Sequence, residues 1–182
     1  MRFIVRLTAW LSLVFFTWLI TRNSLLYFTE PRAHGFVWEK GALADKPLWL
    51  GALVLHVAAG IVCLAASFLQ FFRPVLRRLP ALHRHLGRIY VASVLLVLAP
   101  TGFYLAFFAH GGVPGTIGFL VLGVLTTWTT WRGWREMRAG RMRQHVVWMI
   151  RSMAMVTTAI TFRLEHIAFQ LLGIAPELGF LL

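Results

Sequence analysis

Five apolar stretches, each about as long as a membrane crossing, limit what this chain can fold into. A helix needs about 20 predominantly apolar residues to cross the hydrocarbon core of a bilayer. The stretches that reach this length are residues 3–28, 48–72, 86–109, 115–134 and 145–172. The sequence therefore predicts an all-α fold, a polytopic bundle of about five transmembrane helices that forms a single domain over residues 1–182.

The charge content agrees with a membrane protein. Charged residues make up 13% of the chain and hydrophobic residues 59%, whereas soluble domains carry about 25% charged residues. The net charge of +12 would suggest nucleic-acid binding in a soluble protein. Here the charge lies in short connections between apolar stretches, so we expect the lipid bilayer and its anionic head groups as partners, and no nucleic acid.

The positions of the basic residues predict the orientation in the membrane. Twelve of the 18 basic residues fall on one side of the predicted bundle, together with only one acid, Glu136. They are Arg2, Arg6, Arg73, Arg77, Arg78, Arg84, Arg88, Arg132, Arg135, Arg138, Arg141 and Arg143. Because basic connections stay in the cytoplasm, the N-terminus is predicted to be cytoplasmic and the C-terminus to lie outside.

The last apolar stretch carries ionisable side chains at membrane depth. At about 100° per residue, its polar members fall within about one third of the helix circumference. They are Gln144, His145, Arg151, Ser152, Arg163, His166 and Gln170. The opposite face holds Val146, Met149, Ile150, Met153, Thr157, Ile160, Leu164, Ile167 and Leu171. Because a charge in hydrocarbon costs at least ~2.5–3.5 kcal/mol, we expect the polar face to turn into the bundle and to mark a functional site.

The second stretch has a face of small and polar residues. Its members, three or four positions apart, are His56, Gly60, Cys63, Ser67 and Gln70. Small residues let a neighbouring helix approach closely, so this face is predicted to meet another helix. For His56 two interpretations stay open: a ligand of a bound group, or an imidazole hydrogen-bonded to a backbone carbonyl or a threonine of a neighbouring helix.

Two further features belong to the third and fourth stretches. His83 and His85 lie in a basic connection that enters the third stretch. That stretch carries polar residues along one side and a predicted kink at Pro100; the polar residues are Tyr90, Ser93, Thr101 and Tyr104. The fourth stretch ends in tryptophans that alternate with arginines. This pattern predicts an aromatic belt at the cytoplasmic surface.

Histidines on different helices suggest a cofactor. At about 1.5 Å rise per residue, one polar cluster lies in the outer half of the bundle and one in the inner half. The outer cluster is His56, Arg163 and His166, and the inner cluster is Gln70, His83, His85, His145 and Arg151. Paired imidazoles suit axial ligation of haem iron, while an arginine can pair with a haem propionate. Zinc or copper stay open, since imidazole binds both.

These considerations give two sets of candidate residues. The cofactor-binding candidates are His56, His83, His145, Arg151 and Arg163, and the metal-ligand candidates are His56, His83, His145 and His166. The suspected cofactor is haem b.

Three segments resemble a known family. LHVAAG (55–60), LHRHLGRIYV (82–91) and QHVVWMIRSMAMVTTAITFRL (144–164) are similar to segments of a bacterial family of predicted membrane proteins known as domain of unknown function 2306. The resemblance covers about the second to fifth stretches and implies the bacterial cytoplasmic membrane as the location. The motif positions that it implies are His56, His83, Gly87, Arg88, His145, Trp148, Arg151 and Arg163. It implies no activity.

Three functions remain open from the sequence. The first is a haem-b redox subunit that exchanges electrons with quinone or a partner protein. The second is a transport or binding protein for an anionic solute or lipid, and the third is a non-catalytic assembly or accessory subunit. The sequence leaves open whether the protein is an enzyme.

Overall fold

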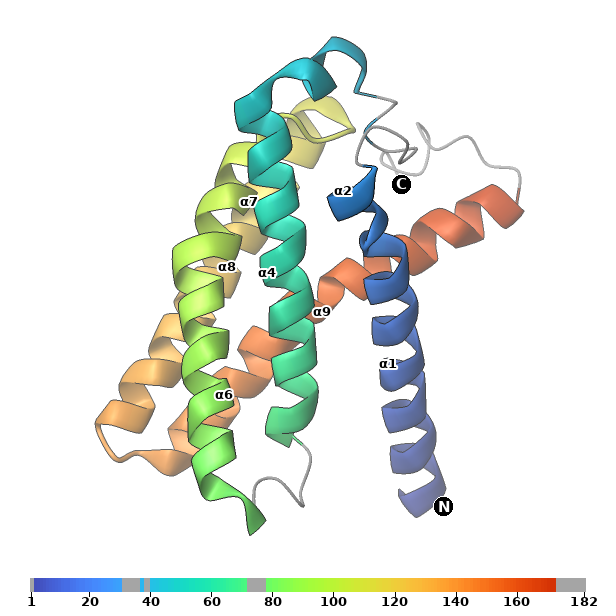
Figure 1. Cartoon of the computed structure of the whole chain (residues 1–182). Coiled ribbons are helices and arrows are strands. Elements are labelled where there is room, and N and C mark those ends of the chain that lie inside the picture. The colour runs from blue at the N-terminus through green and yellow to red at the C-terminus, as the bar shows by residue number, and fades with distance from the viewer. Residues whose placement is uncertain (1, 31–36, 38–39, 72–77, 173–182) are drawn as a thin grey trace. The chain divides into compact units, whose positions relative to one another are not determined.

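A computed structural model describes residues 2–30, 37, 40–71 and 78–172, and within these ranges every regular element is a helix (Figure 1). The elements in chain order are α1 (Arg2–Ser24), α2 (Leu26–Thr29), η2 (Gly41–Asp45), α4 (Pro47–Phe71), α6 (Pro80–Ser93), η3 (Val94–Leu98), α7 (Ala99–Ala106), α8 (Gly112–Arg138) and α9 (Met142–Leu171). The predicted all-α fold is confirmed.

Four helical segments of the described chain are long and apolar enough to cross a membrane. They are Pro47–Gln70, Pro80–Ala106, Gly112–Arg138 and Met142–Phe162, which correspond to the predicted second to fifth stretches. The predicted first stretch, residues 3–28, is helical as α1 and continues after a break at Leu25 as α2. The protein is therefore a membrane helix bundle, as the sequence predicted.

The chain divides into two compact units, Met1–Leu50 and Gly51–Leu182. In the first unit, α1 carries an aromatic group in which Phe15 contacts both Phe16 and Trp18. The Arg22 guanidinium lies 5.9 Å from the centroid of the Trp18 ring. The second unit contains α4 from Gly51 onward, α6 to α9, and all described candidate residues. A single domain over residues 1–182 remains a prediction.

The third span begins earlier than predicted and contains an irregular turn. Proline is favoured at the first position of a helix, and α6 begins at Pro80 rather than at residue 86. His83 and His85 therefore lie on the helix and not in a loop. At the position of the predicted kink, η3 is a π-helical turn directly before α7. Pro100 lies at the start of α7 and has no N–H to bond back into the preceding turn, which favours this irregularity.

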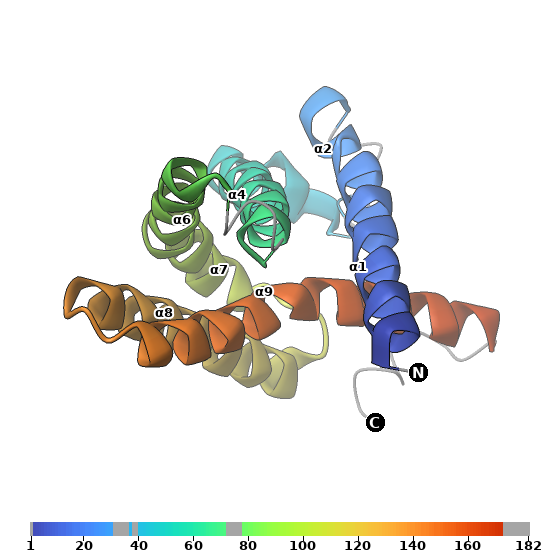
Figure 2. The ribbon, with the colours of Figure 1, turned by 90° about the horizontal axis from the view of Figure 1, so that it is seen from below.

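The fourth and fifth spans form a tight hairpin. Residues 139–141 join α8 to α9, and Gly140 has a positive φ of 74°, a backbone conformation that glycine adopts without a steric penalty. The two helices are the most extensively packed pair of the described chain, and seen from below they run next to each other (Figure 2). At Gly133 a Cβ atom would lie 2.5 Å from Met149 Sδ, so a side chain at this position would have to displace Met149 of α9.

Candidate functional site

The predicted face of the second span is confirmed as the contact between α4 and the third span. At one end, His56 Nδ1 lies 3.0 Å from Thr101 Oγ1, and Gly102 leaves room for the imidazole, because a Cβ there would lie 3.0 Å from His56 Cε1. At the other end, Gln70 Nε2 donates to the backbone carbonyl of His83 at 2.6 Å.

The middle of the same face contains small and polar residues. A Cβ atom at Gly60 would lie 3.9 Å from Leu98 Cδ1. Cys63 and Ser67 are buried beside Tyr90, and Ser67 Oγ donates to the Cys63 carbonyl at 2.7 Å. The predicted face of α4 therefore lies toward the third span, as the spacing of its small residues suggested.

The partner of His56 fixes its tautomer. The Thr101 hydroxyl donates its single proton to backbone carbonyls, at 2.6 Å from Val97 O and 3.2 Å from Leu98 O. Its oxygen must then accept from His56, so Nδ1 carries the proton and Nε2 keeps a lone pair. The threonine-bonded interpretation of His56 is confirmed, and a ligand role for its Nε2 stays a prediction.

A chain of buried hydroxyls joins α6, α8 and α9. Tyr90 Oη lies 2.7 Å from Ser152 Oγ, and Thr130 Oγ1 lies 2.6 Å from Ser152 Oγ. Thr130 donates its own proton to the Thr126 carbonyl at 2.7 Å. It must therefore accept from Ser152, and Ser152 must accept from Tyr90. Each hydroxyl in this buried chain is satisfied.

The sequence indicated two members of this chain but not the chain itself. Tyr90 and Ser152 both lie on polar faces of their predicted helices. Thr130 gave no signal, because threonines in helices usually bond to their own backbone. Thr126, Thr127 and Thr129 do so in α8.

The Tyr90–Ser152 contact places His83 level with His145. Helices α6 and α9 start from the same end of the second unit (Figure 1), and each histidine precedes its hydroxyl residue by seven positions. Seven residues are about two turns, or about 10.5 Å, so the two imidazoles fall on the same sides as Tyr90 and Ser152. The structure therefore places two of the predicted inner cluster's histidines at the same end of the second unit, on α6 and α9.

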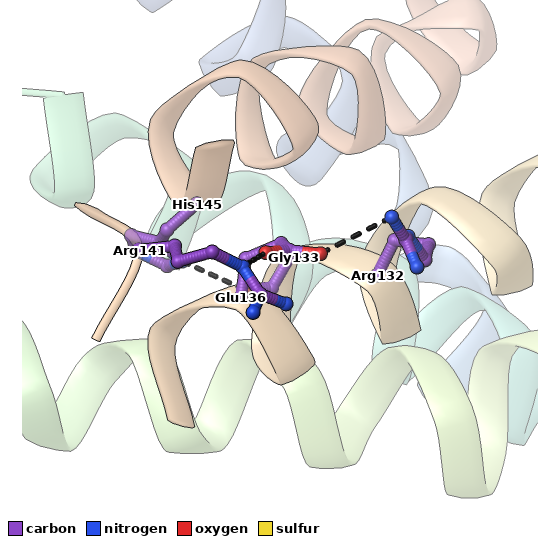
Figure 3. A network of polar contacts seen from close by, with 5 residues as sticks. All are labelled: Arg132, Gly133, Glu136, Arg141 and His145. Atoms are coloured by element: carbon purple, nitrogen blue, oxygen red, sulfur yellow. Dashed lines mark hydrogen bonds and ion pairs between the residues drawn. The ribbon is translucent and has the colours of Figure 1, made fainter. Parts of the chain in front are cut away.

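The environment of His145 leaves one ring nitrogen available. His145 Nδ1 lies 2.9 Å from the Gly133 carbonyl oxygen (Figure 3). A carbonyl can only accept, so Nδ1 carries the proton and Nε2 has a lone pair, the arrangement found in metal-bound histidines. His83 Nδ1 is buried, and among the described residues it has no hydrogen-bond partner.

Glu136 ties the end of α8 to the start of α9. Its side chain is 3% exposed; one carboxylate oxygen lies 3.2 Å from Arg132 Nη2, and the other accepts from Arg141 Nε (Figure 3). The hydrogen bond to Glu136 raises the pKa of the Arg141 guanidinium. Because the His145 N–H donates to the Arg141 carbonyl, this network also fixes the first turn below His145.

Two guanidinium groups lie against the ring of Trp148, one turn after His145 on α9. The Arg132 and Arg151 Cζ atoms lie 5.6 Å and 4.5 Å from the centroid of the Trp148 ring. The segment of α9 from His145 to Ser152 therefore contacts α8 through four different side chains: His145, Trp148, Met149 and Ser152.

The predicted faces of α9 need a correction. Arg151 was predicted to point into the bundle but is exposed, and Ile160, assigned to the lipid face, is buried. The reason is the stripe that packs inward, whose members are His145, Met149, Ser152, Val156 and Ile160. Arg151 lies beside this stripe and reaches the indole of Trp148 instead.

The remaining candidates divide into two groups. His85 is exposed on α6. Arg163 and His166 lie on α9, but their side chains are outside the described part of the structure, so the outer cluster remains a prediction. Within the described residues, no three His, Cys, Asp or Glu side chains group together as a metal site.

A comparison with protein families gives one match. Residues 53–179 match the model of a family described as "Predicted membrane protein (DUF2306)". A search of curated proteins and a search of solved structures gave no match.

Proposed function

The chain belongs to the DUF2306 family of predicted membrane proteins, and from this premise we propose that it is an electron-transfer subunit that holds haem b between His83 and His145. The observation that supports this most directly is the level placement of these two imidazoles on α6 and α9, two turns below the Tyr90–Ser152 contact. Histidine is a common protein ligand of haem iron, and cofactor sites in helix bundles are built from side chains on facing helices.

The hydrogen bond of His145 supports a ligand role. An imidazole that donates its Nδ1 proton to a backbone carbonyl presents Nε2 to a metal in a fixed orientation and with raised basicity. The Gly133 carbonyl provides this bond for His145. A porphyrin supplies four nitrogen ligands itself, so two imidazoles complete the coordination of its iron.

The same geometry separates His56 from this pair. The Thr101 partner of His56 lies 18 positions after His83 on the third span, which is about 27 Å along the helix. Arg163 lies 18 positions after His145 and is equally far away. His56, Arg163 and His166 are therefore candidates for a second site, at the other end of the span. Of the two predicted arginines, Arg151 is the one at the same end of the span as His83 and His145.

The proposed role follows from haem chemistry and from the location. A haem held by two histidines would have no coordination position left for another ligand, and it would transfer single electrons. We infer that the electron partner is a membrane quinone or a redox protein, and that the protein works in the cytoplasmic membrane of a bacterium.

Absorption spectra of protein produced with ample haem supply test this proposal. The wild type should show the Soret band of a haem protein, and a pyridine haemochrome assay should identify haem b. His83→Ala and His145→Ala should each lose most of the bound haem. His85→Ala is the matched control, because His85 lies two positions from His83 but is exposed; it should keep haem.

Two results would contradict the proposal. One is a wild-type protein that is folded and helical but has no Soret band. The other is equal haem loss in the control and in the two test variants, which would show that the histidines act through folding rather than ligation.

A further inference from the structure

The indole of Trp148 brings together two positive charges from two helices. Arg132 comes from α8 and Arg151 from α9, and their guanidinium carbons lie 5.6 Å and 4.5 Å from the same ring centroid. Each guanidinium gains from the electrons of the ring face, but two like charges beside one ring repel each other. Glu136 lies against Arg132 and balances one of the two charges, so one positive charge of the pair is left for a further anion.

Most N–H donors of the two guanidinium groups are not used by Glu136. Arg132 uses Nη2 for the carboxylate of Glu136 at 3.2 Å, and its buried Nε has no hydrogen-bond partner within the described ranges. Arg151 is exposed, and in the part of the chain that the structure describes no acid pairs with it. Since each guanidinium has five N–H donors, Glu136 leaves most of them unused.

The position of the cluster along the hairpin fits the membrane surface. Arg132 and Trp148 are each eight residues from Gly140 in the hairpin turn, which is about 12 Å. The polar head-group layer is about 5–7 Å thick on each side. A turn that reaches the outer edge of this layer therefore puts Arg132 and Trp148 about 5 Å inside the hydrocarbon boundary. Arg151, eleven residues from Gly140, lies about 10 Å inside it. Arginine side chains at such depths extend toward the head groups.

We propose that Arg132, Trp148 and Arg151 bind the phosphate group of an anionic membrane ligand. Arginine forks match the geometry of phosphate and bind it in two-point fashion. Tryptophan is favoured at the level of lipid head groups, where its ring is half in hydrocarbon and its N–H is in the polar layer. The proposal does not depend on haem, since none of the three residues is a proposed iron ligand.

Native mass spectrometry of detergent-purified protein with added lipid tests this site. The wild type should retain phosphatidylglycerol in preference to phosphatidylcholine. Arg151→Gln and Arg132→Gln should each lower this retention about tenfold, because each removes charge-assisted hydrogen bonds to phosphate. Arg151→Lys, which keeps the charge but not the fork, should fall between them and the wild type.

Arg135→Gln is the matched control. Arg135 stacks on Trp131 at 4.7 Å in the same part of α8 and has the same chemistry, but it lies outside the cluster. Retention in this variant should stay within about twofold of the wild type. Equal loss in the control would overturn the proposal and leave a general electrostatic attraction; equal retention of the two lipids by the wild type would also overturn it.

Inorganic phosphate distinguishes the two sources of such a ligand. If phosphate in the low millimolar range neither binds nor displaces the lipid, the site recognises a lipid head group. If phosphate alone binds and loses binding in Arg151→Gln but not in Arg135→Gln, the site takes a soluble phosphate compound. Variants are compared only after circular dichroism and gel filtration show wild-type folding; should Arg132→Gln fail this check, the Arg151 variants decide.

Discussion

The hydroxyl groups of Tyr90 and Ser152 lie 2.7 Å apart in the middle of the second unit, and both side chains are buried. This contact sets the level of α6 relative to α9, because both residues are held on packed helices. His83 and His145, each two turns away on its helix, lie at the same level as a consequence. The candidate site is therefore positioned by a contact that contains no candidate ligand.

Removing either end of this contact should destabilise the protein. Tyr90→Phe and Ser152→Ala should each lower the free energy of unfolding by about 1 kcal/mol, since a buried hydroxyl loses its partner. The double variant should lose less than the sum of the two changes, because both remove the same bond. Thermal unfolding in one detergent measures all three. Thr161→Ala, at an exposed threonine of the same helix, is the control and should be neutral.

The close packing at Gly133 can be tested with two glycines of one helix. Gly133→Ala should destabilise the protein by about 1–3 kcal/mol, because the new methyl group would collide with Met149. Gly118→Ala on α8, where nothing lies within 4 Å of the new atom, should be neutral or stabilising by about 0.5–1 kcal/mol. If both changes have the same effect in thermal unfolding, Met149 does not limit the space at position 133.

Glu136 should matter for the order of the hairpin turn. Glu136→Gln removes the carboxylate that holds Arg132 and Arg141, so we expect a lower melting temperature and faster trypsin cleavage after Arg141. Cleavage after Arg138, which stacks on Trp134 at 5.5 Å, serves as the internal reference. An unchanged ratio of the two cleavage rates would show that the ion pairs do not order the turn.

The predicted orientation can be tested with single cysteines in a Cys63→Ser background. Ala139→Cys, in the exposed turn between α8 and α9, should be protected from a membrane-impermeant maleimide in intact cells. Lys46→Cys, exposed before α4, should be labelled. The opposite pattern would mean that the arginine-rich connections are not cytoplasmic.

The sequence predicted the helices better than their contacts. Apolar length alone located four spans within a few residues of the helices observed, apart from the start at Pro80. The face of α4 was also predicted correctly, because glycine and serine at three- and four-residue spacing have few other uses inside a membrane. A proline next to a basic connection was misread as part of a loop, although it is the first residue of α6.

The face of α9 was predicted less well, for a physical reason. The prediction assumed that a charged side chain in a span must point inward. Arg151 avoids this requirement, because its guanidinium lies against the indole of Trp148 while its backbone lies beside the buried stripe. This contact lies within α9 itself, between residues three positions apart, and the hydropathy pattern does not reveal it because it scores each side chain separately.

The close match between α8 and the first part of α9 also bears on how the protein is made. Of the four candidate spans, α9 is the least apolar, and its polar side chains His145 and Ser152 find their partners on α8, the segment synthesised just before it. The last two spans are thus suited to leave the translocon as a pair, and a chain from which α8 is deleted would leave His145 and Ser152 of α9 without these partners.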